Sequence, residues 1–438
     1  MIIMKFGGRT LSTAENIRFV CRLIQQRLSY KPVVIISALA DVTDQLDKAA
    51  HKTASTGKIS LNAIRRKHKL ILKKLDLNYS VLEKLLLELE VVLKGVSLLR
   101  ELTPRTLDYV LSFGERFAVR IISSYLATQG IDSNPLDAFK IGLITDSNYG
   151  NATPLPESSG LIRKNLMPYK KLPIITGFIG KDKKGEITTL GRDGSDYSAS
   201  FIGAALNVKE IQIWRNLPGI MTADPAIVKN SRLVNNITLE EASELVHYAN
   251  GVLHPYMLAP AIDKCIPVRM LNVFDSESKG TLILNRKDDK PAIKLIAYKK
   301  DVILVNIVSP EIFYHRRLAV KVFEILTHYK IFFHLLASSE ISISFVTNSK
   351  VPHLKEAVKK ISSFANLNIL KDKGIICVIG EGIKYNQKAI SRIFDTLGKT
   401  GVKEEMIIHN ALKTNFTFIV GKKDINKTVN NLHKLLFK

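Results

Sequence analysis

The sequence predicts an α/β fold in which a mostly parallel sheet lies between helices, followed by two smaller α+β modules. Apolar runs that strongly favour strands alternate with amphipathic helical patterns along the first part of the chain. The run Pro32–Ser37 is continuously apolar up to its last residue, as expected for a strand buried on both faces of a parallel sheet. Beyond a charged linker near Asn285, two blocks of about 70 residues each repeat the order β-α-β-β-α, too long for a solenoid repeat.

The N-terminal elements follow from this alternation. In order, the pattern predicts a strand at 1–5, a helix at 13–28, a strand at 32–38, helices within 58–102 and a helix from 103 onward. Ser12 and Glu15 have capping-box spacing before the first helix, and Thr103 with Pro104 is typical of a helix start. Residues 58–102 favour a helical bundle packed on the sheet over a coiled coil, because their apolar repeat lasts only about three heptads.

The later elements are predicted in the same way. The rest of the first domain holds a strand at 172–178, a hairpin turn at 181–186, a strand at 210–214 and a helix from Thr238 to Asn250. The first C-terminal block holds strand 302–308, helix 317–328, strand 332–337, strand 341–347 and helix 353–364. The second holds strand 375–379, helix 387–396, strand 403–409, strand 414–420 and helix 425–436.

Composition narrows the function classes. The 438 residues are 46% hydrophobic, enough for more than one buried core, and no apolar stretch reaches the length of a membrane span. The chain shows no signal-peptide pattern, and its three cysteines are widely separated, which favours a reducing cytoplasm and disfavours a disulfide framework or a zinc site. The net charge of +24 raises nucleic-acid binding as an alternative, but the lysines are scattered in pairs rather than gathered with aromatic residues. We therefore expect neither a nucleic-acid nor a membrane partner.

The first glycine loop follows the N-terminal strand. Lys5 stands near the end of an apolar run and is followed by Gly7 and Gly8. A lysine in this place neutralises phosphoryl oxygens, while glycine amides approach them closely. The loop matches neither the Walker A pattern nor the dinucleotide-binding G-x-G-x-x-G.

A second glycine loop, LGRDGSDYSAS at 190–200, precedes a helix of small residues. A helix N-terminus after glycine offers unpaired N–H groups to an anion. Arg192 adds a planar donor fork for a carboxylate or phosphate, and Asp196 adds a negative charge. Taken alone, the segment is equally typical of an ordinary glycine turn.

Six motifs occur along the chain in a fixed order: KFGG, SALADVTD, SFGERFA, GFIG, TTLGRDGSD and VLHP. With this order the chain resembles the aspartate kinases of the amino-acid kinase superfamily, and its C-terminal blocks are similar to that family's paired ACT domains. The resemblance implies a catalytic domain at 1–285 and ACT-like domains at 300–370 and 371–438. Because the two modules interleave in that family, the segment near residue 300 is a candidate for exchange between them.

The resemblance also implies a reaction and a set of roles. The reaction is transfer of the γ-phosphoryl group of ATP, bound with Mg²⁺, to the β-carboxylate of L-aspartate, the first step of lysine/diaminopimelate, threonine and methionine biosynthesis. The resemblance does not identify the residues that bind the metal. Catalysis falls to Lys5 and Asp196, substrate binding to Ser37, Thr43, Glu115, Arg192 and Ser195, and nucleotide binding to Lys5, Gly7, Gly8, Arg215, Asn216 and Met221.

Several positions depart from the family pattern. On the nucleotide side these are Arg9, Asp193, Arg215, Asn216, Met221, Ala226 and Gly251, and they leave the affinity for ATP open. In the effector region, His334 stands where lysine-sensitive members have an acid, while Ser338, Ser339 and Glu340 match the pattern. Because an imidazole cannot replace a carboxylate toward an ammonium group, we expect an altered response to lysine.

The resemblance further implies a cytoplasmic homodimer formed through the C-terminal modules, with an amino acid as a possible effector. Two alternatives remain open. One is an amino-acid kinase for another carboxylate substrate, which the paired C-terminal blocks disfavour. The other is a catalytically weakened amino-acid sensor, which the retention of Lys5, Glu115, Arg192 and Asp196 disfavours.

Overall fold

The computed structural model describes residues 1–167, 170–246, 248, 255–284, 293–309, 316–409 and 414–437. The predicted linker after Asn285, the end of the helix predicted to reach Asn250, Gly251 and most of the VLHP motif lie outside these residues. The chain forms two compact units. Unit 1 comprises Met1–Ile220, Asn235–Leu239 and Leu253–Arg286, and unit 2 comprises Met221–Val234, Glu240–Val252 and Lys287–Lys438. Within the described ranges, no helix combines the length and the apolar character needed to cross a membrane.

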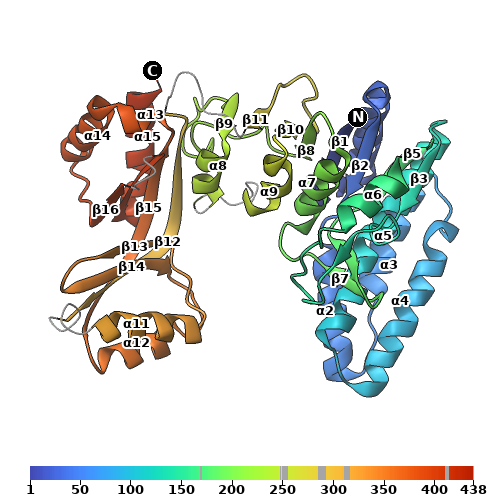
Figure 1. Cartoon of the computed structure of the whole chain (residues 1–438), viewed down its shortest axis with the longest axis horizontal. Helices are drawn as coiled ribbons and strands as arrows, with labels where there is room; N and C mark the ends of the chain where they lie inside the picture. Colours follow the sequence, from blue (N-terminus) through green and yellow to red (C-terminus); the bar gives the residue numbers. More distant parts are fainter. Residues whose placement is uncertain are drawn as a thin grey trace. The chain divides into compact units, whose positions relative to one another are not determined.

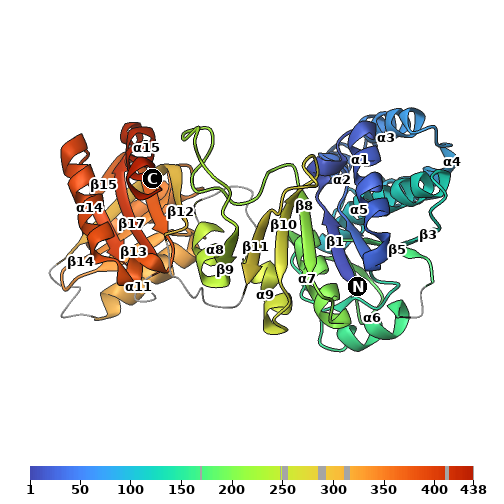
Figure 2. The same cartoon turned by 90° about the horizontal axis from the view of Figure 1, so that it is seen from above.

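Unit 1 is built on an eight-stranded sheet of order β3-β5-β2-β1-β8-β10-β11-β9 (Figures 1 and 2). All described pairs in it are parallel except β10 with β11. The strands are β1 (Ile2–Phe6), β2 (Pro32–Ile36), β3 (Ser133–Leu136), β5 (Leu172–Thr176), β8 (Ile211–Arg215), β9 (Asn236–Thr238), β10 (Val268–Asn272) and β11 (Thr281–Leu284). This mostly parallel sheet confirms the predicted fold class.

Helices cover both faces of the sheet (Figure 2). One face carries α7 (Gly194–Leu206), flanked by α6 (Ser158–Leu166) and α9 (Pro255–Asp263). The other carries α5 (Pro104–Thr128), against which α1 (Ala14–Gln26) and α2 (Val42–Thr56) pack. Strand β1 runs between these layers, so its side chains alternate between the two faces.

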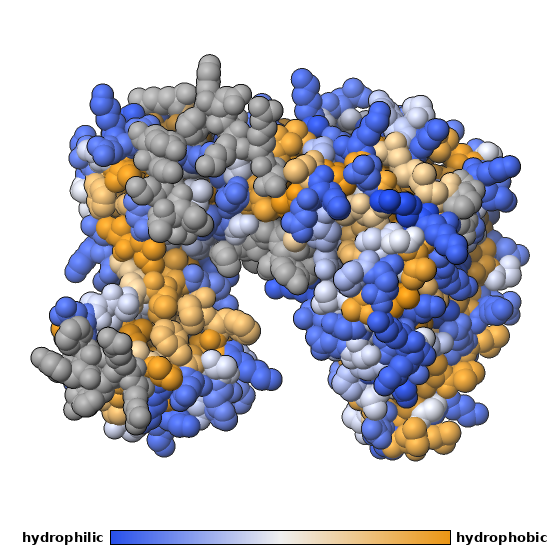
Figure 3. Space-filling model, viewed as in Figure 1, coloured by the Kyte–Doolittle hydropathy of each residue, from blue (hydrophilic) through white to orange (hydrophobic). Residues whose placement is uncertain are grey.

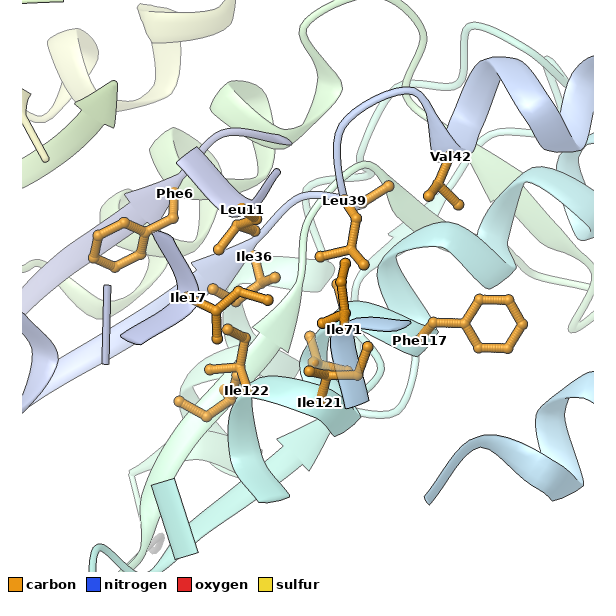
Figure 4. Close-up of a cluster of buried hydrophobic side chains, with 14 of the residues drawn as sticks. Phe6, Leu11, Ile17, Ile36, Leu39, Val42, Ile71, Phe117, Ile121 and Ile122 are labelled. Carbon is orange, nitrogen blue, oxygen red and sulfur yellow. The ribbon is translucent and has the colours of Figure 1, made fainter. Parts of the chain in front are cut away.

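That alternation places the first catalytic candidate. Ile2, Met4 and Phe6 join the core that includes α1 and α5, part of which is drawn in Figure 4. Ile3 points the other way, toward Gly203 of α7. Lys5, two residues further along β1, therefore lies on the α7 side at the carboxyl end of the strand, where ligands bind in open α/β sheets.

Two further parts of unit 1 were predicted as helices and as a turn. Residues 58–102 form α3 (Asn62–Lys74) and α4 (Ser80–Leu99), as predicted, but these helices pack on helices α1, α2 and α5, so the prediction that they pack on the sheet was wrong. The turn predicted at 181–186 joins β6 (Ile179–Asp182) to β7 (Ile187–Thr189), and these strands form a small sheet with β4 (Ile144–Thr145).

The helix starts were predicted with mixed success. Thr103 caps α5 as predicted, accepting a hydrogen bond from the Thr106 N–H at 3.1 Å. The cap of α1 is Thr13, which accepts from the Asn16 N–H at 3.2 Å, so the capping box predicted at Ser12 was wrong by one residue. Ser12 instead accepts a side-chain hydrogen bond from Asn16.

Unit 2 is built on a six-stranded antiparallel sheet of order β13-β14-β12-β15-β17-β16. Its strands are β12 (Leu295–Val308), β13 (Leu335–Ser338), β14 (Ser342–Asn348), β15 (Asn366–Ile379), β16 (Met406–His409) and β17 (Asn415–Gly421). Its helices include α11 (Arg316–His328), α12 (Leu354–Ser362), α14 (Gln387–Thr400) and α15 (Ile425–Leu436). The predicted order of strands and helices is confirmed.

Strands β12 and β15 are much longer than predicted and each serves both modules. Ile303, Val305 and Ile307 of β12 lie in the core of the first module, whereas Ile296 lies in the core of the second. Leu295 pairs with Ile379 at one end of the ladder, and Val308 with Asn366 at the other. The segment near residue 300 is therefore exchanged between the modules.

Residues 221–234 fold with unit 2. Tyr298 donates a hydrogen bond from its hydroxyl to Asp224 at 2.6 Å, and Thr222 lies 2.8 Å from the imidazole Nε2 of His433. Ala223 and Val228 join the core of the second module.

Candidate active site

Three charged side chains meet at the carboxyl ends of β1 and β8. The Nζ of Lys5 lies 2.6 Å from Asp196 Oδ1, and the Nη2 of Arg215 lies 2.7 Å from Asp196 Oδ2. Asp196 stands in the first turn of α7, and Arg215 is the last residue of β8, the neighbour of β1. The structure thus brings together residues that are 191 positions apart in sequence.

Burial strengthens the attraction between Asp196 and its two cationic partners. Lys5 and Asp196 are almost completely buried, and Arg215 is mostly so. Burial alone would raise the pKa of Asp196, but the charges of Lys5 and Arg215 hold it below its ordinary value. One carboxylate between two cations leaves a net positive charge, which favours an anion at this end of the sheet.

The glycine loop after β1 passes close to the backbone of the segment that follows β2. A Cβ on Gly8 would lie 2.7 Å from the carbonyl oxygen of Ala38, so a side chain there would displace the loop. A Cβ on Gly7 would lie 3.6 Å from the Nζ of Lys5, which places this residue beside the ammonium group. The Thr10 hydroxyl closes the turn by donating to the Gly7 carbonyl at 2.7 Å.

Glu115 is a buried acid on α5. Its Oε1 accepts a hydrogen bond from the Ala38 N–H at 3.0 Å, and its Oε2 is buried without a hydrogen-bond partner among the residues that the structure describes. Burial raises the pKa of Glu115 to about 8, opposed by the Ala38 hydrogen bond and by the positive charge of Lys5. The unpartnered oxygen and the raised pKa indicate a carboxyl group prepared to receive a cationic ligand.

Two of the predicted substrate-side hydroxyls lie next to glycines of neighbouring segments. Thr43, in the first turn of α2, has its Oγ1 3.7 Å from the position of a Cβ on Gly114, directly before Glu115. Ser195, before Asp196, has its Oγ 2.8 Å from the position of a Cβ on Gly177. These glycines let the strand ends and helix starts of the site approach one another.

Three other predicted residues lie at the edge of the site. Ser37 follows β2, is half-buried and donates its N–H to the Phe6 carbonyl at 3.2 Å. Arg192 points into solvent with 90% of its side chain exposed, and its charged contact is Asp193 at 3.9 Å. Asn216, after β8, is also exposed. The structure therefore brings Lys5, Asp196 and Arg215 together but leaves Arg192 outside this cluster.

The remaining predicted residues belong to unit 2. Met221 is half-buried and forms an isolated β-bridge with Leu233. The Nε2 of His334 lies 3.0 Å from Asn348 Oδ1, and the backbone N–H of His334 donates to the Val346 carbonyl at 2.7 Å. Ser338, Ser339 and Glu340 are exposed around the turn that joins β13 to β14.

Asp108 is a buried acid that sequence reasoning missed and that supports the loop before α7. It is buried on α5 and accepts hydrogen bonds from the Gly150 N–H at 2.9 Å, the Thr189 N–H at 2.8 Å and the Thr189 hydroxyl at 2.8 Å. These bonds fix the end of β7, from which the 190–200 loop begins. The sequence does contain a clue to Asp108. It precedes Glu115 by seven residues, or two helical turns, so both acids lie on the same face of the helix.

Within the ranges that the structure describes, no three His, Cys, Asp or Glu side chains gather in a way that could hold a metal ion. Asp196 is the one carboxylate in the cationic cluster formed by Lys5 and Arg215.

Comparisons with known proteins show the family of the chain. Residues 1–272 match the model of the amino acid kinase family, and residues 376–436 match an ACT domain model. Aspartokinase 1, chloroplastic, of Arabidopsis thaliana is 36% identical over 456 residues, covering all of this chain and 80% of the relative. Lysine-sensitive aspartokinase 3 of Escherichia coli strain K12 is 26% identical, covering all of this chain and 99% of the relative.

Solved structures are similar over the same length. The crystal structure of E. coli aspartokinase III in complex with lysine and aspartate, described as the T-state, has a TM-score of 0.86 at 26% identity and covers 100% of both chains. The structure of that enzyme with aspartate and ADP, described as the R-state, has a TM-score of 0.81 at 25% identity, again over 100% of both chains.

Proposed function

The chain belongs to the aspartokinases of the amino acid kinase family, and we propose that its phosphoryl transfer is carried by the buried cluster of Lys5, Asp196 and Arg215. The observation that supports this most is the pair of ion contacts that Asp196 makes at the carboxyl ends of β1 and β8. They hold two cations where charge develops during the transfer.

The chemistry needs charge neutralisation rather than a base. One oxygen of the aspartate β-carboxylate attacks the γ-phosphorus, forming a new O–P bond. The bond from that phosphorus to the β–γ bridging oxygen breaks, and ADP leaves with the electron pair. A carboxylate is already ionised, so no proton has to be removed from the nucleophile. Lys5 stabilises the transferring group, and Asp196 holds Lys5 in position.

The substrate side is formed by Glu115 with Ser37, Thr43, Ser195 and Arg192. The unpartnered Oε2 of Glu115 receives the α-ammonium group of aspartate, which favours the ionised carboxyl group. Arg192 supplies the bidentate partner for the α-carboxylate. Its exposure gives the side chain freedom to reorient when substrate arrives.

The nucleotide side is formed by Lys5, Gly7, Gly8, Arg215 and Asn216 of unit 1, whereas Met221, which was predicted with them, belongs to unit 2. Arg215 adds a second cation for the ATP phosphates at a position where the family pattern has none, which offsets the negative charge that Asp193 brings. Mg²⁺ keeps several waters and takes one or two carboxylates plus substrate phosphates, so the single acid Asp196 fits an ion that arrives with ATP. When bound, the ion neutralises phosphate charge.

The regulatory and assembly roles belong to the same proposal. The catalytic domain lies within residues 1–285, apart from the segments 221–234 and 240–246, which fold with unit 2. Residues 300–370 and 371–438 act as regulatory modules that bind an amino-acid effector near His334, Ser338, Ser339 and Glu340. The chain works in the cytoplasm as a homodimer. Exposed apolar residues on the first module support pairing there, since the Phe332 side chain is 82% exposed and Val320 and Ile341 are more than half exposed. Figure 3 shows apolar surface over β12, β13 and β14.

A hydroxamate assay tests the activity directly. Purified protein receives ATP, Mg²⁺, hydroxylamine and a panel of amino acids, and the proposal expects acyl-hydroxamate with L-aspartate alone. Product with another carboxylate would change the substrate, and absence of product with all of them would favour an amino-acid sensor. Lys164→Ala, which removes an exposed lysine on α6, is the matched control for Lys5→Ala. Light scattering of the same preparation tests the dimer.

A further inference from the structure

A cavity in unit 2 is lined mainly by lysines that the kinase reaction does not use. It has a volume of about 630 Å³ and is lined by Lys300, Lys371, Asp372, Lys373, Gly421, Lys422, Lys423 and Asn426. We propose that this cavity, named here the lysine cavity, binds a small anion with several phosphate groups. The shared chemistry is that of a polyphosphate chain, which either inorganic tripolyphosphate or a nucleoside triphosphate supplies.

The two long strands create the cavity where they change register. Asp301 of β12 has a φ of 59° and Asp372 of β15 has a φ of 52°, both in the left-handed region. The register of β12 against β15 shifts between Lys299 and Leu304. On the other edge of β15, Lys373 pairs with Gly421 of β17. These irregularities interrupt the strand alternation, so neighbouring lysines come to line one cavity.

Positively charged side chains outnumber negatively charged ones in the lining of the lysine cavity. Five lysines line it against one acid, Asp372. Two of the lysines are held by acids outside the lining, since Lys422 pairs with Asp301 and Lys373 lies 2.8 Å from Glu405. Lys371 and Lys423 make no ion pair in the part of the chain that the structure describes, and both are exposed. They are therefore available to an incoming anion.

The backbone beside the lysines also favours an anion. Helix α15 begins at Ile425, next to the lining residue Asn426, and its N-cap Asp424 makes no side-chain capping hydrogen bond. A helix N-terminus carries partial positive charge and free N–H groups. This adds to the lysine charge at the same edge of the cavity.

The dimensions favour a small ligand over a nucleic acid. Cavities of about 300–1,000 Å³ are typical of small-molecule sites. Single-stranded nucleic acids are usually bound along a groove with aromatic side chains on which bases stack, and no aromatic residue lines this cavity. The lining instead offers point charges, which suit phosphate groups.

The test combines binding with chemical footprinting of the full chain. Inorganic tripolyphosphate, ATP, AMP and inorganic phosphate are each titrated at low ionic strength, and lysine acylation is mapped by mass spectrometry. We expect tripolyphosphate to protect Lys371 and Lys423. In K371Q/K423Q its affinity for this site falls by about tenfold or more, because two charged contacts are lost. ATP binding as tightly as tripolyphosphate would identify the phosphate chain as the recognised part, and tighter ATP binding would identify the nucleoside triphosphate.

A matched control removes equal charge from the same unit. Lys359 and Lys360 are exposed in the last turn of α12, away from the lysine cavity, so K359Q/K360Q should leave affinity and protection unchanged. The catalytic site is distinguished because protection of Lys371 and Lys423 reports the lysine cavity alone. Absence of protection by tripolyphosphate, or an equal loss in both double variants, would overturn the proposal. Tighter binding of a short oligonucleotide, lost equally in both variants, would replace it with an extended nucleic-acid surface.

Discussion

Glu115→Gln gives a direct measure of the buried acid in the ligand-free protein. Burial raises the pKa of Glu115 from 4.5 to about 8. In the unfolded chain the group ionises near 4.5, so between these values the folded protein holds a proton that the unfolded chain has released. The stability that Glu115 contributes is therefore complete below pH 4.5 and is lost as the pH rises toward 8.

The size of the effect follows from the same two values. Each pH unit between pH 4.5 and 8 lowers the free energy of unfolding by about 1.36 kcal/mol. The loss is about 5 kcal/mol over the whole range and about 3 kcal/mol up to pH 7. Glutamine keeps the carbonyl oxygen that accepts from Ala38 but does not titrate. Relative to the wild type, the variant should gain about 1.4 kcal/mol in free energy of unfolding per pH unit between pH 5 and 7.5.

The assay is urea unfolding followed by the fluorescence of Trp214. This is the single tryptophan of the chain and it is fully buried in β8, so its signal reports unit 1. The exposed Glu101→Gln is the control and should give a difference from the wild type that does not change with pH. A pH-independent difference for Glu115→Gln would refute the reasoning, because it would mean that the folded protein already holds Glu115 ionised. Saturating aspartate should reduce the slope, since a bound ammonium group favours the ionised carboxyl.

Three further predictions concern turnover, recognition and regulation. Lys5→Ala should lower kcat by about 10²–10³, because a charge aimed at the transition state is lost, whereas Lys164→Ala should not; near-normal turnover would remove Lys5 from the mechanism. Arg192→Lys should raise the KM for aspartate by about tenfold and leave that for ATP unchanged, because the bidentate fork is lost. A rise in the KM for ATP, with the KM for aspartate unchanged, would instead assign Arg192 to the phosphate site. Lysine should inhibit the wild type weakly and His334→Asp more strongly, since a carboxylate pairs with an ammonium group; tight lysine binding to the wild type in calorimetry would contradict this.

The parts of the site that sequence reasoning predicted are those fixed by strand and helix geometry. Lys5 stands at the end of a buried strand, and Asp196 in the first turn of a helix that follows glycine, so each position follows from its own element. Parallel strands of one sheet end at the same edge, which brings these two residues together. The sequence could not show that Arg192, four residues before Asp196, points into solvent, because side-chain direction in a loop depends on contacts from distant segments.

The parts that were missed depend on pairing between distant segments. The extra length of β12 and β15 comes from hydrogen bonds between strands about 70 residues apart, and the lysines near Asp301 and Asp372 carry no strand signal. Asp108 was overlooked because its partners, Gly150 and Thr189, lie far along the chain. The shift of the α1 cap from Ser12 to Thr13 shows that neighbouring hydroxyl residues are equally good caps until the helix axis is fixed.

The exchange of strand segments in unit 2 has a consequence for how the chain can be cut, copied and synthesised. Residues 371–438 lack the segment around Leu295–Lys299 that completes their own sheet, so a fragment with these bounds would expose an unpaired strand edge. On the ribosome, Leu295 emerges 84 residues before its partner Ile379 and has to wait for it. The core of the first module lies within residues 303–361, so this module can fold before the second has been translated, whereas the second module needs the Leu295–Lys299 segment that precedes the first. A gene rearrangement that moved residues 371–438 alone would leave the second module without this strand segment.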